Sequence, residues 1–183
     1  MRNQMKESIA DAFVTLAKKK SIDKITVKDL VDYCGISRQS FYYHFQDILE
    51  VIEWQAQRME EEFSIQVQKA GSFEEAAELL AKSVIDSRDL IEKLRESQQR
   101  DFVEKLVMDS MKERFRETAR RAAMDAPLPM TPTEADALIR FFTFGLAGLM
   151  MAHCYEKEPD AKVLSRQIIA VFRYLVPSPE ERK

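Results

Sequence analysis

Glycine, proline, cysteine, histidine and tryptophan are all scarce in this sequence. Its 183 residues include four glycines, six prolines, two cysteines, two histidines and one tryptophan. Collagen-like chains and low-complexity linkers need far more glycine and proline, so both classes are excluded. The hydrophobic content of 45% instead predicts a folded protein that is long enough to bury a core.

The scarcity of cysteine and histidine also limits the chemistry. Cys34 and Cys154 lie far apart, and neither belongs to a CxxC motif or has a histidine at metal-ligand spacing. We therefore expect no disulfide framework, no metal site, no cofactor and a reducing, cytoplasmic location. The sequence also lacks a phosphate-binding glycine loop, an HExxH motif and a GxSxG motif, so we do not expect an enzyme.

Long uninterrupted apolar segments are missing too. The N-terminal residues MRNQMKESIADAF mix charged and apolar side chains, unlike a secretory signal. The longest apolar run, residues 141–155, falls short of the roughly 20 residues that a membrane-spanning helix needs. We expect no membrane partner, and we interpret this run as a buried helix.

Positive charge is concentrated at one end of the chain. The whole sequence has a net charge of −3, yet residues 1–46 carry eight basic and five acidic side chains, a net charge of +3. The remaining residues therefore carry −6. This change of sign is typical of a chain whose N-terminal part meets an anion.

Apolar residues recur at helical spacing almost everywhere, which predicts an all-α fold of about nine helices. A first helix ends near the lysines at 18–20. Two short helices follow over residues 26–35 and 37–46. The later helices are expected near residues 48–70, 73–86, 88–98, 100–124, 133–156 and 160–176, with a loop at 126–132 rich in proline.

The second and third of these helices are joined by an unusually short turn. Thr26 is a good N-cap with Asp29 three residues later, Gly35 suits the left-handed conformation that ends a helix, and Ser37 can cap the next helix. Helix, tight turn and helix form the helix-turn-helix motif, whose second helix enters the major groove of DNA. We therefore expect a DNA-binding domain over residues 1–46.

The helix expected over residues 37–46 has apolar side chains on one side and hydrogen-bonding side chains on the other. Ile36, Phe41 and Phe45 are expected to point inward, whereas the hydrogen-bonding side chains of Arg38, Gln39, Ser40, Tyr43 and His44 are expected to face outward. Arginine and glutamine can pair with base edges, and the others with bases or phosphates. A helical hairpin with core aromatics has the same composition, so residue types alone leave both interpretations open.

The order of residues favours DNA binding. Residues 26–52, TVKDLVDYCGISRQSFYYHFQDILEVI, resemble the DNA-binding domain of TetR-family regulators, with matches at Thr26, Val27, Gly35, Ile36, Ser37, Tyr42, His44 and Phe45. The resemblance implies a transcriptional regulator, usually a repressor, that binds a palindromic double-stranded DNA operator. It places nine residues at the DNA: Thr26, Lys28, Ser37, Arg38, Gln39, Ser40, Tyr42, Tyr43 and His44.

One residue departs from the family pattern. Many relatives carry a phosphate-binding lysine at the start of the helix after the Tyr-x-His-Phe motif, whereas this chain has Ile48. Each phosphate contact adds to the salt-dependent part of DNA affinity. We therefore expect weaker nonspecific binding than in a relative with the lysine.

The resemblance implies a regulatory and dimerisation domain over residues 47–183, in which the last two helices pair with a second copy. Residues 141–155 are apolar around nearly the whole helix, and their glycines permit close approach of another helix. Two-fold symmetry would let two short helices read matching half-sites. The expected homodimer interface comprises Phe142, Gly145, Leu149, Ala152, Leu164, Ile168, Val171, Phe172 and Leu175.

Family members usually enclose an effector pocket in the helical body, which here would take a small apolar or amphipathic molecule. Candidate lining residues are Trp54, Met59, Phe63, Phe102, Met111, Phe115 and Phe144, and each of them also suits a plain hydrophobic core. A second alternative is control by a protein partner, as in the activators of dihydroxyacetone kinase operons, which are similarly short.

Overall fold

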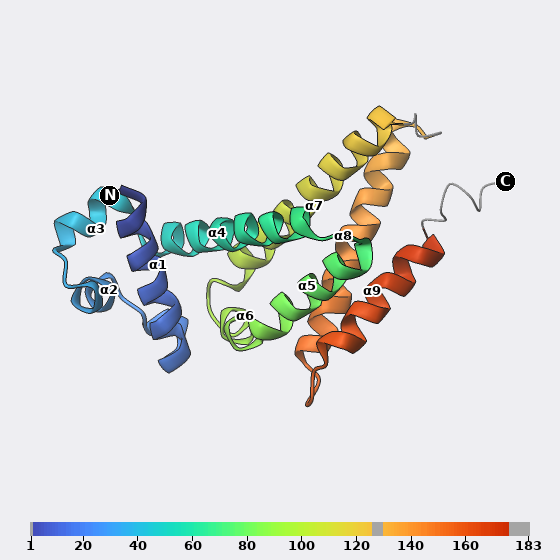
Figure 1. The fold of residues 1–183 in the computed structure, drawn as a ribbon. Coiled ribbons are helices and arrows are strands. Elements are labelled where there is room, and N and C mark those ends of the chain that lie inside the picture. Colours follow the sequence, from blue (N-terminus) through green and yellow to red (C-terminus); the bar gives the residue numbers. More distant parts are fainter. Residues whose placement is uncertain (1, 126–129, 176–183) are drawn as a thin grey trace. The chain divides into compact units, whose positions relative to one another are not determined.

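The computed structural model describes residues 2–125 and 130–175, and this part of the chain is all-α. It contains nine α-helices and one short 3-10 helix, in agreement with the expected fold class (Figure 1). The elements are α1 (Arg2–Lys19), η1 (Ile22–Lys24), α2 (Val27–Cys34), α3 (Arg38–His44), α4 (Ile48–Lys69), α5 (Phe73–Asp86), α6 (Arg88–Arg95), α7 (Arg100–Asp125), α8 (Pro132–Cys154) and α9 (Ala161–Leu175).

The helices group into two compact units. The head unit contains the described residues up to Lys69 together with Asp86–Val103. The body unit contains Ala70–Ile85 and the described residues from Glu104 onward. Compactness thus places α4 and α6 with the N-terminal helices, while the expected division into functional domains at residue 46 stays a prediction.

Local capping accounts for the way α2 and α3 begin and end. Thr26 and Asp29 form a capping box at the start of α2, and Gly35 ends that helix with a φ of 65°. Ser37 then caps α3 by accepting a hydrogen bond from the Ser40 N–H at 3.1 Å. These three expectations are confirmed, and together they place α3 close after α2 beside α1 (Figure 1).

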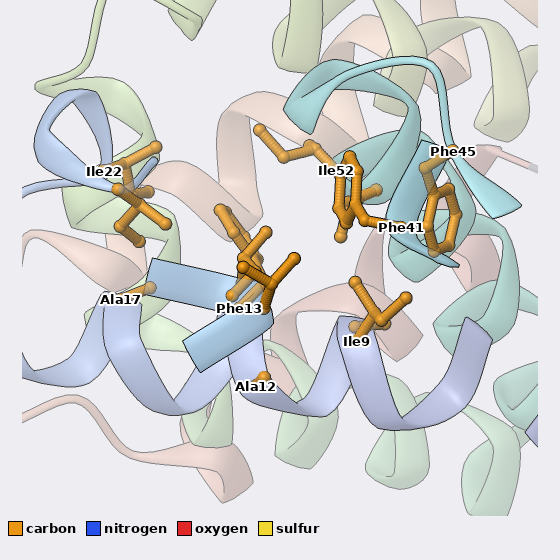
Figure 2. Close-up of a cluster of buried hydrophobic side chains, with 13 residues drawn as sticks. Ile9, Ala12, Phe13, Ala17, Ile22, Phe41, Phe45 and Ile52 are labelled. Atoms are coloured by element: carbon orange, nitrogen blue, oxygen red, sulfur yellow. The ribbon is translucent and has the colours of Figure 1, made fainter. Parts of the chain in front are cut away.

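The core of the head unit joins the first four α-helices. Figure 2 shows Ile9, Phe13 and their neighbours on α1 pointing toward Phe41 and Phe45 at α3, with Ile52 of α4 among them. Phe13, Phe41 and Phe45 are fully buried. Burial of such a side chain contributes about 2–3 kcal/mol, so α3 is held firmly by its inner face.

Helix α6 is anchored to the end of α1 by one lysine. The Lys93 ammonium donates hydrogen bonds to the carbonyl oxygens of Ala17 and Lys18, at 2.5 and 2.8 Å. Beyond α6, the Gln98 N–H donates to the Asp23 carboxylate at 3.0 and 3.2 Å. The expected helix over 88–98 therefore ends earlier, at Arg95, because the following residues turn to make these contacts.

The body unit packs α5, α7, α8 and α9 around an aromatic cluster. Phe142 of α8 stacks on Phe172 of α9 with ring centroids 5.2 Å apart, and Phe73 and Phe115 contact Phe172 as well. Buried His153 adds a polar link, because its Nε2 pairs with Gln167 Oε1 at 2.9 Å. Residues 126–129 of the expected loop lie outside the described residues.

A second capping box begins α8, and the sequence analysis did not predict it. The Thr131 side chain accepts from the Glu134 N–H, and the Glu134 carboxylate accepts from the Thr131 N–H at 2.7 Å. The Thr131 hydrogen bonds hold the pKa of Glu134 below its usual value. The Thr-Pro-Thr-Glu sequence carried the signal, since proline is favoured at the first helical position.

Candidate nucleic-acid interface

The two faces of α3 differ as expected for most residues, whereas Ser40 and His44, which were expected to face outward, are half-buried. Phe41 and Phe45 are buried, while Arg38, Gln39 and Tyr42 are exposed and Tyr43 is 69% exposed. Because the inner face packs into the head core, the outer face is presented as a rigid surface. Two side chains able to form forked hydrogen bonds with bases thus stand at the start of α3.

The exposed surface around α3 carries further groups that can reach phosphates. Lys28 is exposed on α2, and Tyr33, which sequence reasoning missed, is also largely exposed there. Tyr33 has an ordinary helical position, so only the packing reveals that its ring faces solvent. Ser37 instead caps α3, because its hydroxyl oxygen accepts the Ser40 N–H, which makes positioning that helix the first role of Ser37.

Thr26 is held by hydrogen bonds of its own. Its hydroxyl donates to Asp29 Oδ2 at 2.6 Å, and its N–H donates to the same oxygen at 2.7 Å. Lys20 pairs with this carboxylate at 2.8 Å. The Lys20 hydrogen bond, followed by those from Thr26, holds the pKa of Asp29 far below its ordinary value. Thr26 would therefore meet a phosphate only by sharing or releasing its Asp29 partner.

His44 has one ring nitrogen turned inward. Its Nδ1 is buried and has no hydrogen-bond partner among the described residues, and its ring meets the Tyr43 ring edge-on at a centroid distance of 5.0 Å. Any contact of this ring with a phosphate would therefore use Nε2. The packing against Tyr43 couples the orientation of these two rings.

Acidic side chains cap the start of α4. Asp47 accepts the Glu50 N–H at 2.9 Å, and the Glu50 side chain accepts the Gln46 N–H at 2.6 Å. Ile48 packs against the head core. This helix start thus offers carboxylates and an aliphatic side chain.

The expected dimer residues separate into an inner and an outer group. Leu164 and Ile168 are 0% and 2% exposed within the chain's own body, so they leave no surface for a partner. Phe142 and Phe172 stack in the aromatic cluster. Gly145, Ala152 and Val171 are exposed and Leu149 is half-buried, whereas the side chain of Leu175 lies outside the described residues.

Helix α8 is less covered than its composition predicts. It is long and apolar enough to cross a membrane, with a mean hydropathy of 1.5, yet only 22% of that stretch is buried inside the chain. Phe141 and Phe144 are 60% and 65% exposed. The body covers only one side of α8, so the burial on two sides that the sequence predicts would need a second copy and stays a prediction.

The effector-pocket candidates are distributed over both units. In the head unit, Trp54 meets the Phe45 ring at 6.2 Å, Phe102 packs against the core, and Met59 and Phe63 are half-buried. In the body unit, Met111 is half-buried, Phe115 belongs to the aromatic cluster, and Phe144 is exposed. A pocket lined by these residues stays a prediction.

Comparisons with known proteins agree with this geometry. A model of the family described as "Bacterial regulatory proteins, tetR family" matches residues 9–53, which include all of α2 and α3. Among solved structures, "Dihydroxyacetone kinase operon activator DhaS" is similar in fold, with a TM-score of 0.70, 16% identity and coverage of 93% of this chain and 95% of that chain. A comparison with curated proteins gives no match.

The fold, the exposed α3 and the family match lead to one assignment. The regulatory family also agrees with the expectation that the chain is not an enzyme. The chain is a DNA-binding transcriptional regulator that carries the N-terminal domain of the TetR family on an all-α body with a TetR-like fold.

Proposed function

We propose that this regulator binds a palindromic operator as a homodimer, with one α3 in each of two successive major grooves. The observation that carries this proposal is the exposed Arg38–Gln39 pair at the start of a helix whose opposite face is locked into the core. A helix of two turns contacts few bases, so specificity requires a second copy about one helical turn of DNA away.

The outer face of α8 supports the homodimer. Its exposed residues Leu138, Phe141, Gly145, Gly148 and Ala152, followed by Tyr155 at its C-cap, recur alternately three and four residues apart. This spacing forms a straight seam along a helix and is typical of surfaces that pair with another helix. An added Cβ at Gly145 or Gly148 would meet nothing within 4 Å in the chain itself, so the space beside them is open to a partner.

Repression with release by a small molecule is the regulatory mode that we propose. An effector would stabilise a spacing of the two reading helices that does not match the operator, with α4 as the connecting lever. The contact of α4 with α1 supports this role, because Arg58 pairs with Asp11 and packs over the Trp54 ring. We place this activity in the cytoplasm, where the chromosome is accessible.

A second candidate is activation under the control of a protein partner. It is favoured by the similarity in fold to DhaS, a dihydroxyacetone kinase operon activator by its name, along nearly the whole chain. The two candidates differ in what the body encloses. A crystal structure with a bound ligand in the body would favour the effector, whereas a filled interior would favour a partner protein.

The experiment that tests DNA recognition by α3 is selection of bound sequences from a random pool of double-stranded DNA. We expect a palindrome whose half-site centres lie about one or two helical turns apart. Enrichment of a single asymmetric site would contradict the homodimer. Absence of any enrichment, even at low salt, would contradict sequence-specific binding.

A further inference from the structure

The head unit contains a cavity of about 370 Å³ that is open to solvent and is lined by both aliphatic and polar residues. Its aliphatic walls come from three places in the chain: Ile22 begins η1 and Ile25 follows it, Val27 begins α2, and Ile48 and Leu49 begin α4. The polar lining comprises Asp23, Asp47 and Gln99. The volume lies within the range of small-molecule sites, which combine apolar walls with a few polar groups.

The charged residues that line the cavity are both acidic. Asp23 and Asp47 are both exposed, and the residues that line the cavity include neither lysine nor arginine. Both carboxylates are held in place by backbone groups, because Asp23 accepts the Gln98 N–H and Asp47 accepts the Glu50 N–H. Two positioned carboxylates beside an aliphatic wall complement a cation that carries a hydrocarbon group.

Ile48 contributes an aliphatic side chain to this cavity. It lines the cavity and packs against the head core. A lysine at this position would place a positive charge beside the cavity and repel an external cation. The isoleucine adds no charge and extends the apolar wall.

We propose that this cavity binds a short aliphatic ammonium ion. The hydrocarbon chain lies on Ile25, Ile48 and Leu49, and the ammonium group lies against the carboxylates of Asp23 and Asp47. Each methylene that leaves water strengthens binding up to about fourfold until the cavity is filled. This site is separate from the reading face of α3, so its existence does not depend on the proposed function.

The test is an NMR titration of the isotope-labelled full chain, without DNA, at constant ionic strength. The probes are hexylammonium chloride, propylammonium chloride, hexan-1-ol and sodium hexanoate. We expect saturable shifts of the backbone amides at residues 22–27, 47–49 and 98–99 with hexylammonium. Binding should be weaker for propylammonium and hexan-1-ol and undetectable for hexanoate.

Variants identify the groups responsible. Asp47→Asn keeps an oxygen for the Glu50 N–H but loses the charge, and should weaken hexylammonium binding by about threefold. Ile48→Lys should abolish it, while Glu61→Gln, an exposed change on the same helix, should leave it unchanged. If Ile48→Lys does not fold, the Asp47→Asn result and the probe series decide the question.

Several results would overturn the site. These are shifts outside the named amides, equal binding of hexan-1-ol and hexylammonium, unchanged affinity in Asp47→Asn, or no saturable shift at all. Because DNA is absent, none of these results bears on operator recognition. Conversely, failure of the DNA selection would leave this binding site untouched.

Discussion

At the scale of single residues, side chains proposed to contact bases should affect specificity differently from those proposed to contact phosphates. Arg38 and Gln39 are exposed at the start of α3, and Lys28 is exposed on α2. Removing a forked contact to a base costs about 1–3 kcal/mol and relaxes specificity at one position. Arg38→Ala and Gln39→Ala should therefore lower affinity for the selected operator by tenfold or more in fluorescence anisotropy, with nonspecific binding changed less.

Lys28→Ala is the matched control for that experiment. Loss of a phosphate contact should weaken binding to all sequences about equally and make the salt slope shallower by about one. If Arg38→Ala and Lys28→Ala had the same profile across sequences, the assignment of Arg38 to a base would be wrong. Circular dichroism would verify that each variant remains helical.

Ile48 gives a second prediction at this scale. Ile48→Lys should add a phosphate contact, raise nonspecific DNA affinity and make the plot of log affinity against log salt steeper by about one. DNA titrations of wild type and Ile48→Lys at salt concentrations from about 50 to about 200 mM would measure the change in slope. Identical slopes would refute a role for this position at the DNA.

At the scale of elements, the turn between α2 and α3 depends on backbone conformation alone. Gly35 has a φ of 65°, and an added Cβ would meet no atom within 4 Å. Gly35→Ala should therefore destabilise the protein by about 1–2 kcal/mol, the cost of a left-handed conformation for a residue with a side chain. Urea unfolding would measure this loss, and near-native stability would show that the turn changes conformation at little cost.

The start of α2 makes stability depend on pH. Hydrogen bonds from Lys20 and Thr26 lower the pKa of Asp29 from its ordinary value of 3.8. Because the folded pKa is depressed, the contribution of Asp29 to stability is fully present above about pH 5 and is lost as the pH falls through and below 3.8.

Asp29→Asn should accordingly be less stable than wild type at pH 7 and should lose less stability on acidification. Urea midpoints measured between pH 7 and pH 3 would test this, with Asp32→Asn, an exposed change on the same helix, as the control. Parallel curves for wild type and Asp29→Asn would rule out the linkage.

At the scale of the whole molecule, the uncovered face of α8 requires an explanation. Phe141→Glu and Gly148→Glu should each convert the protein to a monomer in sedimentation experiments, because a carboxylate would be buried at the centre of the seam. Val107→Glu changes an exposed apolar residue of α7 and should leave the dimer intact. Dimers that survive both α8 substitutions would place self-association elsewhere.

Sequence reasoning was most accurate where structure is local. Thr26, Gly35 and Ser37 were expected at the positions where α2 and α3 begin and end, since caps and left-handed glycines act over three or four residues. It was least accurate for burial in the body, where Leu164 and Ile168 proved interior and Phe144 exposed. An apolar residue looks the same in a sequence whether its own body or a second copy covers it.

The amino-acid sequence by itself determined the helices, the tight turn and the outward face of α3, because helical periodicity and capping are set by neighbours along the chain. Only the tertiary structure decided which side of α8 is covered and that Ile48 lines a cavity with Asp23 and Asp47. These features arise from contacts between segments that are distant in the sequence, and no local pattern of residues specifies such contacts.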